Sequence, residues 1–474
     1  MIELPIKRDY LPIRISEKVI KEAVEKSKAS NRGIIAIVTA TKPDFYKQAP
    51  VAIECMKQDM PFFIINTGQH FDDVMGYGLK EFGLEKFIAC DLQVRGDLME
   101  KSSEMILKLG TFGRHLKKEY GATVLPVVHG DTLAAGVSPL AWIFSLGQKV
   151  AQNEAGIRSM APVGIKNIKA EPSENDIENF IDKQFNGKWM LMREEPFPEQ
   201  IDTWICAAGT EYFFAPCELA KDNLLREGFP EDRIYTVGNS GIDAIDIKRK
   251  EKPSTSIFEH YPQLEKGEWI RVDIHRRGNL TPTRFKSIVQ GVTDLVKDGY
   301  NVILVELNAT KAALNHYNLR DNLVKLAEEH KNFLFTPLWK EYSHVIEFLD
   351  SKHCAIELTD SGSMQEELLY FKHVMPLTVR LNTDRPETIF QAKNNLLVPP
   401  ISASFITKMV KHVEKNETVK NKIMAKKQIY GKPGEISMKI VEILERENTA
   451  DNIAFRWVHQ RLKLWNETSS LDYL

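Results

Sequence analysis

Strand-like and helical patterns alternate along most of this 474-residue chain, and this alternation constrains its fold more than any other feature. Short runs of β-branched and apolar residues are separated by longer segments whose apolar residues recur at helical spacing, as in 97–119 and 217–227. Uninterrupted apolar runs are typical of strands buried on both faces of a parallel sheet. The pattern therefore predicts an α/β protein with doubly wound, Rossmann-like sheets. In the first half the strand-like runs are Ile34–Thr39, Phe62–Asn66, Val124–Val128, Val150–Gln152, Tyr212–Ala215 and Ile234–Val237.

The alternation occurs in two blocks, which predicts two α/β domains. Two such domains joined by a short linker imply a cleft between them, and domain interfaces are common ligand sites. The strands expected in the second domain are Ile270–Ile274, Val302–Val305, Phe333–Phe335, Ala355–Thr359 and Val374–Val379. The expected organisation is an N-terminal extension (1–30), a first Rossmann-like domain (31–246) with an insertion of no clear period (159–195), a charged linker (247–268), a second Rossmann-like domain (269–447) and a helical tail (448–474).

Composition excludes several classes of protein. Hydrophobic residues make up 43% of the chain and the formal net charge is −2, so no bulk attraction to nucleic acid or anionic lipid is expected. The five cysteines form no CxxC pair, which disfavours a disulfide framework or a zinc site and indicates a reducing compartment. The N-terminus lacks the apolar core of a signal peptide, and the longest apolar window, 133–147, is too short to span a bilayer. We therefore expect a cytoplasmic protein without a membrane segment or a metal site.

Two carboxylates follow neighbouring strand-like runs of the first domain. Asp131 comes after the run that ends at Val128, and Glu154 comes after the run that ends at Gln152. In open α/β sheets, ligands bind at the carboxyl ends of the strands. Asp131 alone could instead be the N-cap of the next helix. A second acid at the equivalent end of the next strand favours a shared chemical role.

Polar and charged groups also follow nearly all of the remaining predicted strands. His275 with Arg276 and Arg277 suits proton transfer beside an anion, or forms a basic surface turn. The segment 359–367 could bring its backbone close to a pyrophosphate at a helix start, or be a capped turn that binds nothing. Together the strand ends predict one shared cleft that handles a phosphorylated ligand and provides acids and a histidine for proton transfer. The remaining polar strand ends are Thr41–Asp44, Gln69–His70 and Arg380–Glu387.

These motifs, in this order, resemble those of the UDP-N-acetylglucosamine 2-epimerases, most of all the non-hydrolysing bacterial and archaeal type. The resemblance runs from about residue 31 to residue 445. It implies the two-domain fold of GT-B glycosyltransferases, a UDP-sugar as the substrate and a homodimer; no cofactor is expected. The motifs that carry it are TKPD at 41–44 with Lys47, TGQH at 67–70, HGDT at 129–132, EAGIR at 154–158, PFPE at 196–199, GNS at 238–240, HRR at 275–277, and the segments 360–367 and 383–387.

The resemblance also implies a reaction. The C2 proton of the sugar would be removed and UDP expelled to give 2-acetamidoglucal, and UDP would then re-add with a proton delivered to the opposite face of C2. By motif position the catalytic residues are Asp131, Glu154, Glu199 and His275. Lys42, Lys47 and Arg158 would lie near the diphosphate or the sugar, and Arg276 would lie near the uracil. Ser361, Gly362 and Ser363 would bind the diphosphate, and Glu367 would bind the ribose. The expected substrate-binding residues are completed by Gln69, His70, Asn308 and Arg385.

Departures from the family pattern surround the expected sugar site. The family's first-loop Arg and Glu are Lys42 and Asp44 here, the Glu after the paired arginines is Gly278, and the Glu and Asn-Arg that follow Glu199 become Gln200, Asp202 and Thr203. The expected function is interconversion of UDP-N-acetylglucosamine and UDP-N-acetylmannosamine. Three alternatives stay open: a hydrolysing 2-epimerase that releases N-acetylmannosamine and UDP, a 2-epimerase of another UDP-2-acetamido sugar, and a GT-B glycosyltransferase that uses a UDP-sugar.

Glu306 stands where the family's His-x-Asn motif has its histidine, with Asn308 two residues later. In bacterial relatives that histidine helps to hold a second UDP-N-acetylglucosamine as an activator. A carboxylate beside an anionic nucleotide-sugar is unfavourable unless a cation offsets it. We therefore expect the usual substrate activation to be absent. Alternatively, Glu306 turns away and pairs with a nearby Arg or Lys, which would leave activation intact.

Overall fold

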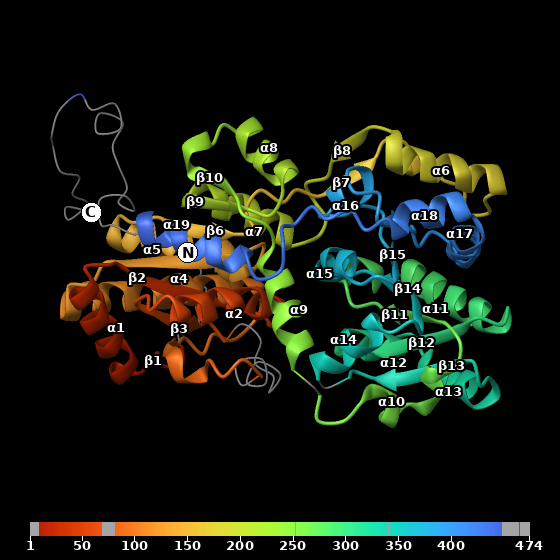
Figure 1. Cartoon of the computed structure of the whole chain (residues 1–474), viewed down its shortest axis with the longest axis horizontal. Helices are drawn as coiled ribbons and strands as arrows, with labels where there is room; N and C mark the ends of the chain where they lie inside the picture. Colours follow the sequence, from red (N-terminus) through yellow and green to blue (C-terminus); the bar gives the residue numbers. More distant parts are fainter. Residues whose placement is uncertain (1–8, 69–80, 252, 340, 448–463, 465–474) are drawn as a thin grey trace, which may run out of the picture. The chain divides into compact units, whose positions relative to one another are not determined.

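The computed structural model describes residues 9–68, 81–251, 253–339, 341–447 and 464 (Figure 1). The chain divides into two compact units. The first comprises the chain up to Ile157, Phe197–Ala244 and the segment from Gly431, and the second comprises Arg158–Pro196 and Ile245–Tyr430. Each unit is built around its own sheet, which confirms the prediction of two Rossmann-like, doubly wound domains. Among the described residues, no helix is long and apolar enough to cross a membrane.

The sheet of the first unit has eight strands in the order β1-β4-β3-β2-β5-β6-β9-β10, and only the edge strand β1 runs antiparallel to its neighbour. From β2 the chain adds β3 and β4 on one side and then returns to add β5 and the later strands on the other. This reversal makes the gap between β2 and β5 the topological switch point. The strands are β1 (Arg14–Ile15), β2 (Ile34–Thr39), β3 (Phe62–Asn66), β4 (Ile88–Asp91), β5 (Val124–His129), β6 (Val150–Asn153), β9 (Thr210–Ala215) and β10 (Ile234–Thr236).

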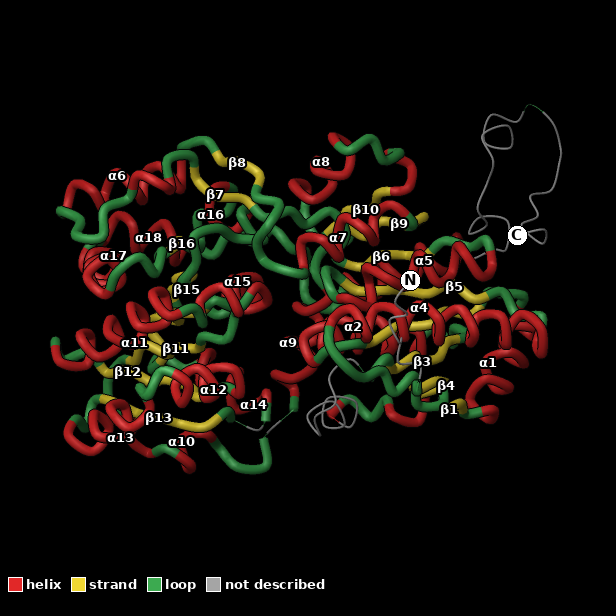
Figure 2. Tube along the Cα trace, turned by 180° about the vertical axis from the view of Figure 1, so that it is seen from behind, coloured by secondary structure: helices red, strands yellow, loops and turns green. Residues whose placement is uncertain are grey.

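Helices cover both faces of this sheet, as Figure 2 shows. Ile34, Ala36 and Val38 of β2 belong to a core cluster with side chains of α1, α4 and α5. The alternate residues Ile35 and Ile37 point the other way and are equally buried, and α2 contacts β2, β3 and β5 and packs against α19. The helices are α1 (Glu17–Ser30), α2 (Lys42–Lys57), α4 (Leu98–His115), α5 (Leu133–Leu146), α7 (Glu199–Ala208), α8 (Glu218–Arg226), α9 (Ser240–Lys250) and α19 (Ile436–Glu447).

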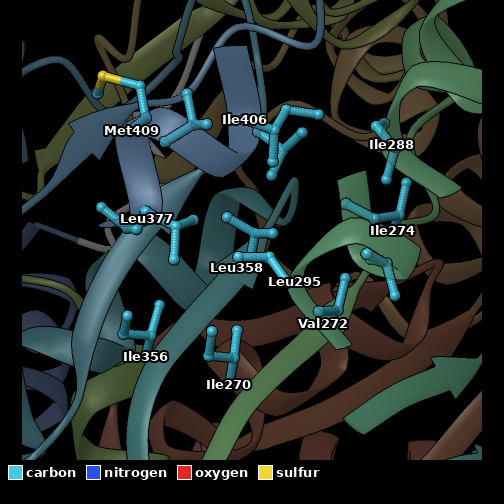
Figure 3. Packing of buried hydrophobic residues seen from close by; sticks show 14 of the residues in the cluster. Ile270, Val272, Ile274, Ile288, Leu295, Ile356, Leu358, Leu377, Ile406 and Met409 are labelled. Carbon is cyan, nitrogen blue, oxygen red and sulfur yellow. The ribbon is translucent and has the colours of Figure 1, made fainter. Parts of the chain in front are cut away.

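The sheet of the second unit has six parallel strands in the order β13-β12-β11-β14-β15-β16, with its switch point between β11 and β14. Figure 3 shows the apolar face that β11, β14 and β15 turn toward α11 and α17, where Leu358 and Leu377 meet Ile288 and Ile406. The elements are β11 (Trp269–Asp273), α11 (Pro282–Lys297), β12 (Asn301–Glu306), α12 (Asn308–His316), α13 (Arg320–Glu329), β13 (Phe333–Pro337), α14 (Tyr342–Asp350), β14 (Cys354–Thr359), α15 (Gly362–Glu367), β15 (Met375–Thr378), α16 (Glu387–Phe390), β16 (Leu396–Leu397), α17 (Ala403–Lys415) and α18 (Glu417–Met424).

Residues 158–196 belong to the second unit, whereas the sequence analysis placed 159–195 as an insertion in the first domain. The segment forms β7 (Met160–Pro162), α6 (Glu174–Asn186) and β8 (Trp189–Leu191). Phe180 of α6 joins the second core, and α6 lies beside α17 (Figure 1). The side-chain amide of Gln184 donates to the carbonyl oxygen of Leu397 (3.2 Å) and accepts from its backbone N–H (2.6 Å), which satisfies backbone groups at the outer edge of β16. Packing against this edge explains why the segment follows the second sheet.

Other boundaries also differ from the sequence analysis. Residues from Arg14 onward are part of the first sheet, because β1 pairs with β4 and α1 buries Ile20 in the core. The expected linker contains α10 (Ile257–His260), whose Ile257 is buried. After Tyr430 the chain returns to the first unit and forms α19 there. The expected tail at 448–474 lies outside the described residues apart from Leu464.

Candidate active site

The strand ends next to the switch point of the first unit bring a charged cluster into its interior. Lys47, in α2, donates to Oε2 of Glu154, and Nε2 of His129, the last residue of β5, lies 2.7 Å from the same oxygen. All three residues are at most 5% exposed. A carboxylate withdrawn from water needs such partners, because burying an unpaired charge is costly. The cluster therefore fixes one acidic group at the carboxyl end of the sheet.

The backbone around Glu154 is fixed as firmly as its carboxylate. Glu154 has a φ of +62°, in the left-handed region that non-glycine residues rarely adopt. The preceding Asn153 donates from Nδ2 to Oγ of Ser240 (2.9 Å), and Ser240 donates to the carbonyl oxygen of Lys47 (2.7 Å). The first residue of α9 thus ties together the backbones that carry Glu154 and Lys47.

Asp131 follows β5 and a turn at Gly130, whose φ is +61°. The N-cap of α5 is Thr132, whose hydroxyl accepts from the backbone N–H of Ala135 (3.2 Å). The capping role that Asp131 could have taken therefore belongs to its neighbour, and the Asp131 carboxylate is not committed to it.

Asp44 is a buried acid close to Asp131. Burial raises the pKa of Asp44 to about 7; His129 acts to lower it and the Asp131 charge adds to the rise. The Asp44 carboxylate accepts from the backbone N–H of Ala40 (2.7 Å) and of Thr41 (3.3 Å), which starts α2 with a capping box. Asp44 thus combines a structural role with a charge near Asp131.

Glu199 and Asp202 bring two more acids to the same region. Glu199 is the first residue of α7 and is half-buried, and Asp202 lies one turn later and is buried. Burial raises the pKa of Asp202 to about 8, and the negative charges of Asp131 and Glu199 add to this shift. Two expected catalytic acids, Asp131 and Glu199, are therefore brought together with an acid that the sequence analysis noted only as a departure.

In the second unit Asp360 organises the turn that follows β11. Its carboxylate accepts from the backbone N–H groups of His275 (2.9 Å) and Arg276 (3.0 Å) and from Nδ2 of Asn279 (3.0 Å). Nδ1 of His275 lies 3.3 Å from Oδ1 of the same carboxylate, and the His275 side chain is 36% exposed. Asp360, at the end of β14, thus holds a histidine at the switch point with its ring accessible.

A second buried carboxylate in this unit is surrounded by arginines. Arg380 donates to Oδ1 of Asp384 (2.7 Å), and Nη1 of Arg385 lies 3.3 Å from Oδ2. Burial acts to raise the pKa of Asp384, but the charges of Arg380, Arg385 and Arg276 outweigh it and hold the pKa well below its usual range. A Cβ atom on Gly362 would lie 3.2 Å from both Nη2 of Arg276 and an oxygen of Asp384, so a side chain there would crowd this cluster.

The expected diphosphate and ribose residues lie in one short segment. Ser361 is the N-cap of α15 and accepts from the backbone N–H of Met364 (3.4 Å), so the capped turn considered in the sequence analysis is present. Oγ of Ser363 lies 3.4 Å from Oγ of Ser361. The carboxylate of Glu367 accepts from the hydroxyl of Tyr342 (2.5 Å). Arg385 is buried and pairs through Nε with Glu366, so part of its guanidinium is engaged within the unit.

Glu306 is paired within the second unit. Nε and Nη2 of Arg320 donate to its two carboxylate oxygens, at 2.7 and 3.3 Å. The pairing with a nearby cation that the second alternative for Glu306 requires is therefore present. Asn308 begins α12 and is exposed.

Glu195 lies close to Gly278, the position at which the family has a glutamate. A Cβ atom on Gly278 would be 3.9 Å from Oε2 of Glu195 and 3.2 Å from Nη1 of Arg284. Arg284 in turn contacts Glu195 (3.6 Å) and donates to the carbonyl oxygen of Gly278 (3.0 Å). The backbone oxygen of Glu195 accepts from Asn382 (2.9 Å). Segment 158–196 therefore brings a carboxylate beside the turn that carries His275, which spacing in the sequence could not reveal.

Gln69 and His70 lie outside the described residues, and for Lys42 only its place at the start of α2 is described. Arg158 is almost fully buried. Within the described ranges, no group of three or more His, Cys, Asp or Glu side chains could hold a metal ion.

Known proteins share this sequence pattern and fold. The model of a family described as UDP-N-acetylglucosamine 2-epimerase matches residues 192–445. The UDP-N-acetylglucosamine 2-epimerase of Methanocaldococcus jannaschii is 28% identical over 373 residues, which cover 77% of this chain and 88% of that protein. A crystal structure of the M. jannaschii enzyme in complex with UDP-GlcNAc and UDP has a TM-score of 0.66 and 26% identity, and the match covers 87% of this chain and 99% of that one. The Neisseria meningitidis UDP-GlcNAc 2-epimerase, bound to UDP-GlcNAc, is alike in fold, with a TM-score of 0.69 and 23% identity over 87% of this chain and 100% of that one.

Proposed function

The chain belongs to the UDP-N-acetylglucosamine 2-epimerase family, and from this premise we propose that it interconverts UDP-N-acetylglucosamine and UDP-N-acetylmannosamine without net hydrolysis. One carboxylate removes the C2 proton; the electron pair of the C2–H bond forms a C1=C2 double bond as the C1–O bond breaks and UDP leaves. UDP then attacks C1 of the resulting 2-acetamidoglucal while a second acid delivers a proton to the opposite face of C2. At the end of a turnover the first group holds the C2 proton and the second has lost one; proton exchange with water returns both groups to their starting states, so no further co-reactant is needed.

The observation that carries the proposal is the acidic region at the switch point of the first unit. Glu154 is buried but paired with Lys47 and His129, while Asp131 and Glu199 both act electrostatically on Asp202. Several carboxyl groups at one end of the sheet suit a reaction that needs one group to take a proton and another to give one. We assign Asp131, Glu154 and Glu199 to these transfers, with His275 as the fourth catalytic group.

We assign UDP to the second unit. Ser361, Gly362 and Ser363 offer small side chains and hydroxyls at the diphosphate, Arg276 approaches the uracil, and Glu367 accepts from the ribose hydroxyls. Support comes from the buried Asp360, which accepts from the backbone N–H of Arg276, and from the buried Asp384, which accepts from Arg380. The remaining proposed substrate contacts are Lys42, Lys47, Gln69, His70, Arg158, Asn308 and Arg385.

The test is incubation with UDP-N-acetylglucosamine in deuterated water, followed by NMR of the products. Deuterium should enter C2, and UDP-linked sugars should dominate at equilibrium. Accumulation of free N-acetylmannosamine and UDP would move the enzyme to the hydrolysing branch. Absence of any C2 exchange, with transfer of the sugar to an acceptor, would instead identify a glycosyltransferase.

We also propose that the enzyme is a homodimer in the cytoplasm. Met99 and Leu107 of α4 are 74% and 53% exposed, and Phe144 of the adjoining α5 is 79% exposed. Exposed apolar side chains that gather on packed helices favour a protein partner, and a second copy of the chain is the simplest one. Substitution Phe144→Glu should lower the mass in solution to that of one chain, whereas Val163→Glu should not. The five cysteines are free and buried, the state that a reducing compartment maintains.

A further inference from the structure

Helix α7 buries an acid and exposes isoleucines. Ile201 and Ile205 are 46% and 39% exposed, whereas Asp202 is 4% exposed. A surface helix of a globular domain normally turns its apolar residues inward and its charged residues outward. Burying a carboxyl group costs free energy, so this inverted arrangement indicates that the buried carboxyl group of Asp202 has a functional role.

The carboxyl group of Asp202 occupies space that a glycine leaves open. A Cβ atom at Gly136 of α5 would lie 2.8 Å from Oδ1 of Asp202 and 3.2 Å from its Cα. Within the described part of the chain, Oδ2 of Asp202 has no hydrogen-bond partner. Asp44, by contrast, accepts from two backbone N–H groups. Asp202 therefore lacks the structural role that explains the burial of Asp44.

Two negatively charged side chains act on Asp202. Glu199 lies three residues earlier on α7, a spacing that makes the two side chains neighbours, and Asp131 precedes α5. The nearby polar pair Gln152 and Thr203 is uncharged. Three carboxyl groups in a partly buried region cannot all ionise without strong repulsion.

We propose that Asp202 is a positioning residue that keeps its proton at neutral pH and thereby keeps a third negative charge away from Asp131 and Glu199. This inference rests on the proposed function, because Asp131 and Glu199 are two of its catalytic acids. Asp202 acts through these two carboxylates and needs no contact with the substrate.

The proposal predicts a loss of turnover in mild alkali. Burial raises the pKa of Asp202 to about 8, so the proton leaves as the pH rises through that value. The ionised group then adds a third negative charge beside those of Asp131 and Glu199. It also repels an anionic substrate, so turnover should fall on the alkaline side.

The test compares the pH profile of kcat for the wild type and for Asp202→Asn. Asparagine has the same shape but cannot ionise, so the alkaline midpoint should move upward by about one pH unit or more. Asp222→Asn, on the exposed face of α8, is the matched control and should leave the midpoint in place. An unchanged midpoint in Asp202→Asn would overturn the proposal.

Potentiometric titration of the substrate-free protein separates this inference from the proposed function. Between about pH 7 and pH 9 the wild type should release about one proton more than Asp202→Asn. Equal proton release would overturn the inference whatever the turnover. A wild type that shows this extra proton but no C2 exchange would overturn the proposed function, and with it the catalytic role of Asp202, while leaving its titration established.

Discussion

The two sheets share one strand order around their switch points, yet Asp44 and Asp202 in the first unit and Asp384 in the second are buried in opposite electrostatic surroundings. In the first unit, burial raises the pKa of Asp44 to about 7 and that of Asp202 to about 8, and the charge of Asp131 strengthens both shifts. In the second unit, burial also acts to raise the pKa of Asp384, but Arg380 and its neighbouring arginines outweigh it and hold the pKa low.

Because the two sheets have the same strand order around their switch points, the different pKa values of these acids come from the side chains around each acid. Acids that retain or share protons suit proton exchange at carbon, which the first unit is proposed to perform. Arginines around a fully ionised acid form a rigid positive frame, which suits a diphosphate.

The largest expected effect is on turnover when the proposed acids of the first unit are neutralised. Asp131→Asn, Glu154→Gln and Glu199→Gln should each lower kcat by about 10²-fold or more, because each removes a proton-transfer group. Steady-state kinetics with UDP-N-acetylglucosamine measures this. A Glu199→Gln enzyme near wild-type rate would show that the PFPE motif does not supply a catalytic acid.

Next in size is the effect of Asp360→Asn on UDP binding. The variant removes the charge that fixes His275 and Arg276 through their backbone N–H groups, so UDP affinity should fall by about 1.5–3 kcal/mol. Calorimetric titration with UDP measures the change, and circular dichroism checks the fold. Undiminished affinity would mean that this turn is only a structural connection.

A smaller effect concerns stability and its pH dependence. An Asp in the unfolded chain ionises near pH 4, whereas folded Asp202 holds its proton to about pH 8. The folded state binds more protons in this window, so its stability falls as the pH rises through it. Asp202→Asn removes this loss, so its stability relative to that of the wild type should grow by about 1.4 kcal/mol for each pH unit between about pH 5 and pH 7. Chemical denaturation at several pH values would show a constant difference if Asp202 were ionised throughout.

The smallest expected effect tests the carboxylate that segment 158–196 brings to the second unit. Glu195→Ala should weaken UDP-sugar binding by up to about 1 kcal/mol, since the group is partly exposed. Adding Gly278→Glu should restore binding, because a side chain at 278 would point at the vacated place. Glu194→Ala is the control. A double variant no better than Glu195→Ala would show that the two positions do not substitute for each other.

The sequence predicted the fold because its strongest signals are local. The apolar run at 124–128 became β5 almost residue for residue, and the run at 374–379 became β15. The helix α6 was missed because its flanks have no clear period, although Ser173 and Asp176 form a capping box that marks its start. The return of 431–447 to the first unit depends on packing between α19 and α2, which no local pattern encodes.

The positions of Asp131, Glu154 and His275 were predictable because parallel strands end at one edge of a sheet. The groups that surround these residues were not predictable from the sequence. The protonation of Asp202 depends on the approach of α7 to Gly136, and the place of Glu195 depends on the docking of segment 158–196. Sequence reasoning thus located the strand ends, while the charge state of the groups there required the packed structure.

The central claim is that acids of the first unit exchange the C2 proton, whereas the second unit holds UDP and contributes His275. The most direct test is a side-by-side calorimetric titration of UDP into Glu154→Gln and Asp360→Asn, with C2 deuterium exchange measured on the same preparations. Glu154→Gln should retain wild-type UDP affinity and lose C2 exchange, whereas Asp360→Asn should lose UDP affinity. Equal loss of UDP affinity in both variants, or exchange at the wild-type rate in Glu154→Gln, would contradict the division of labour between the two units.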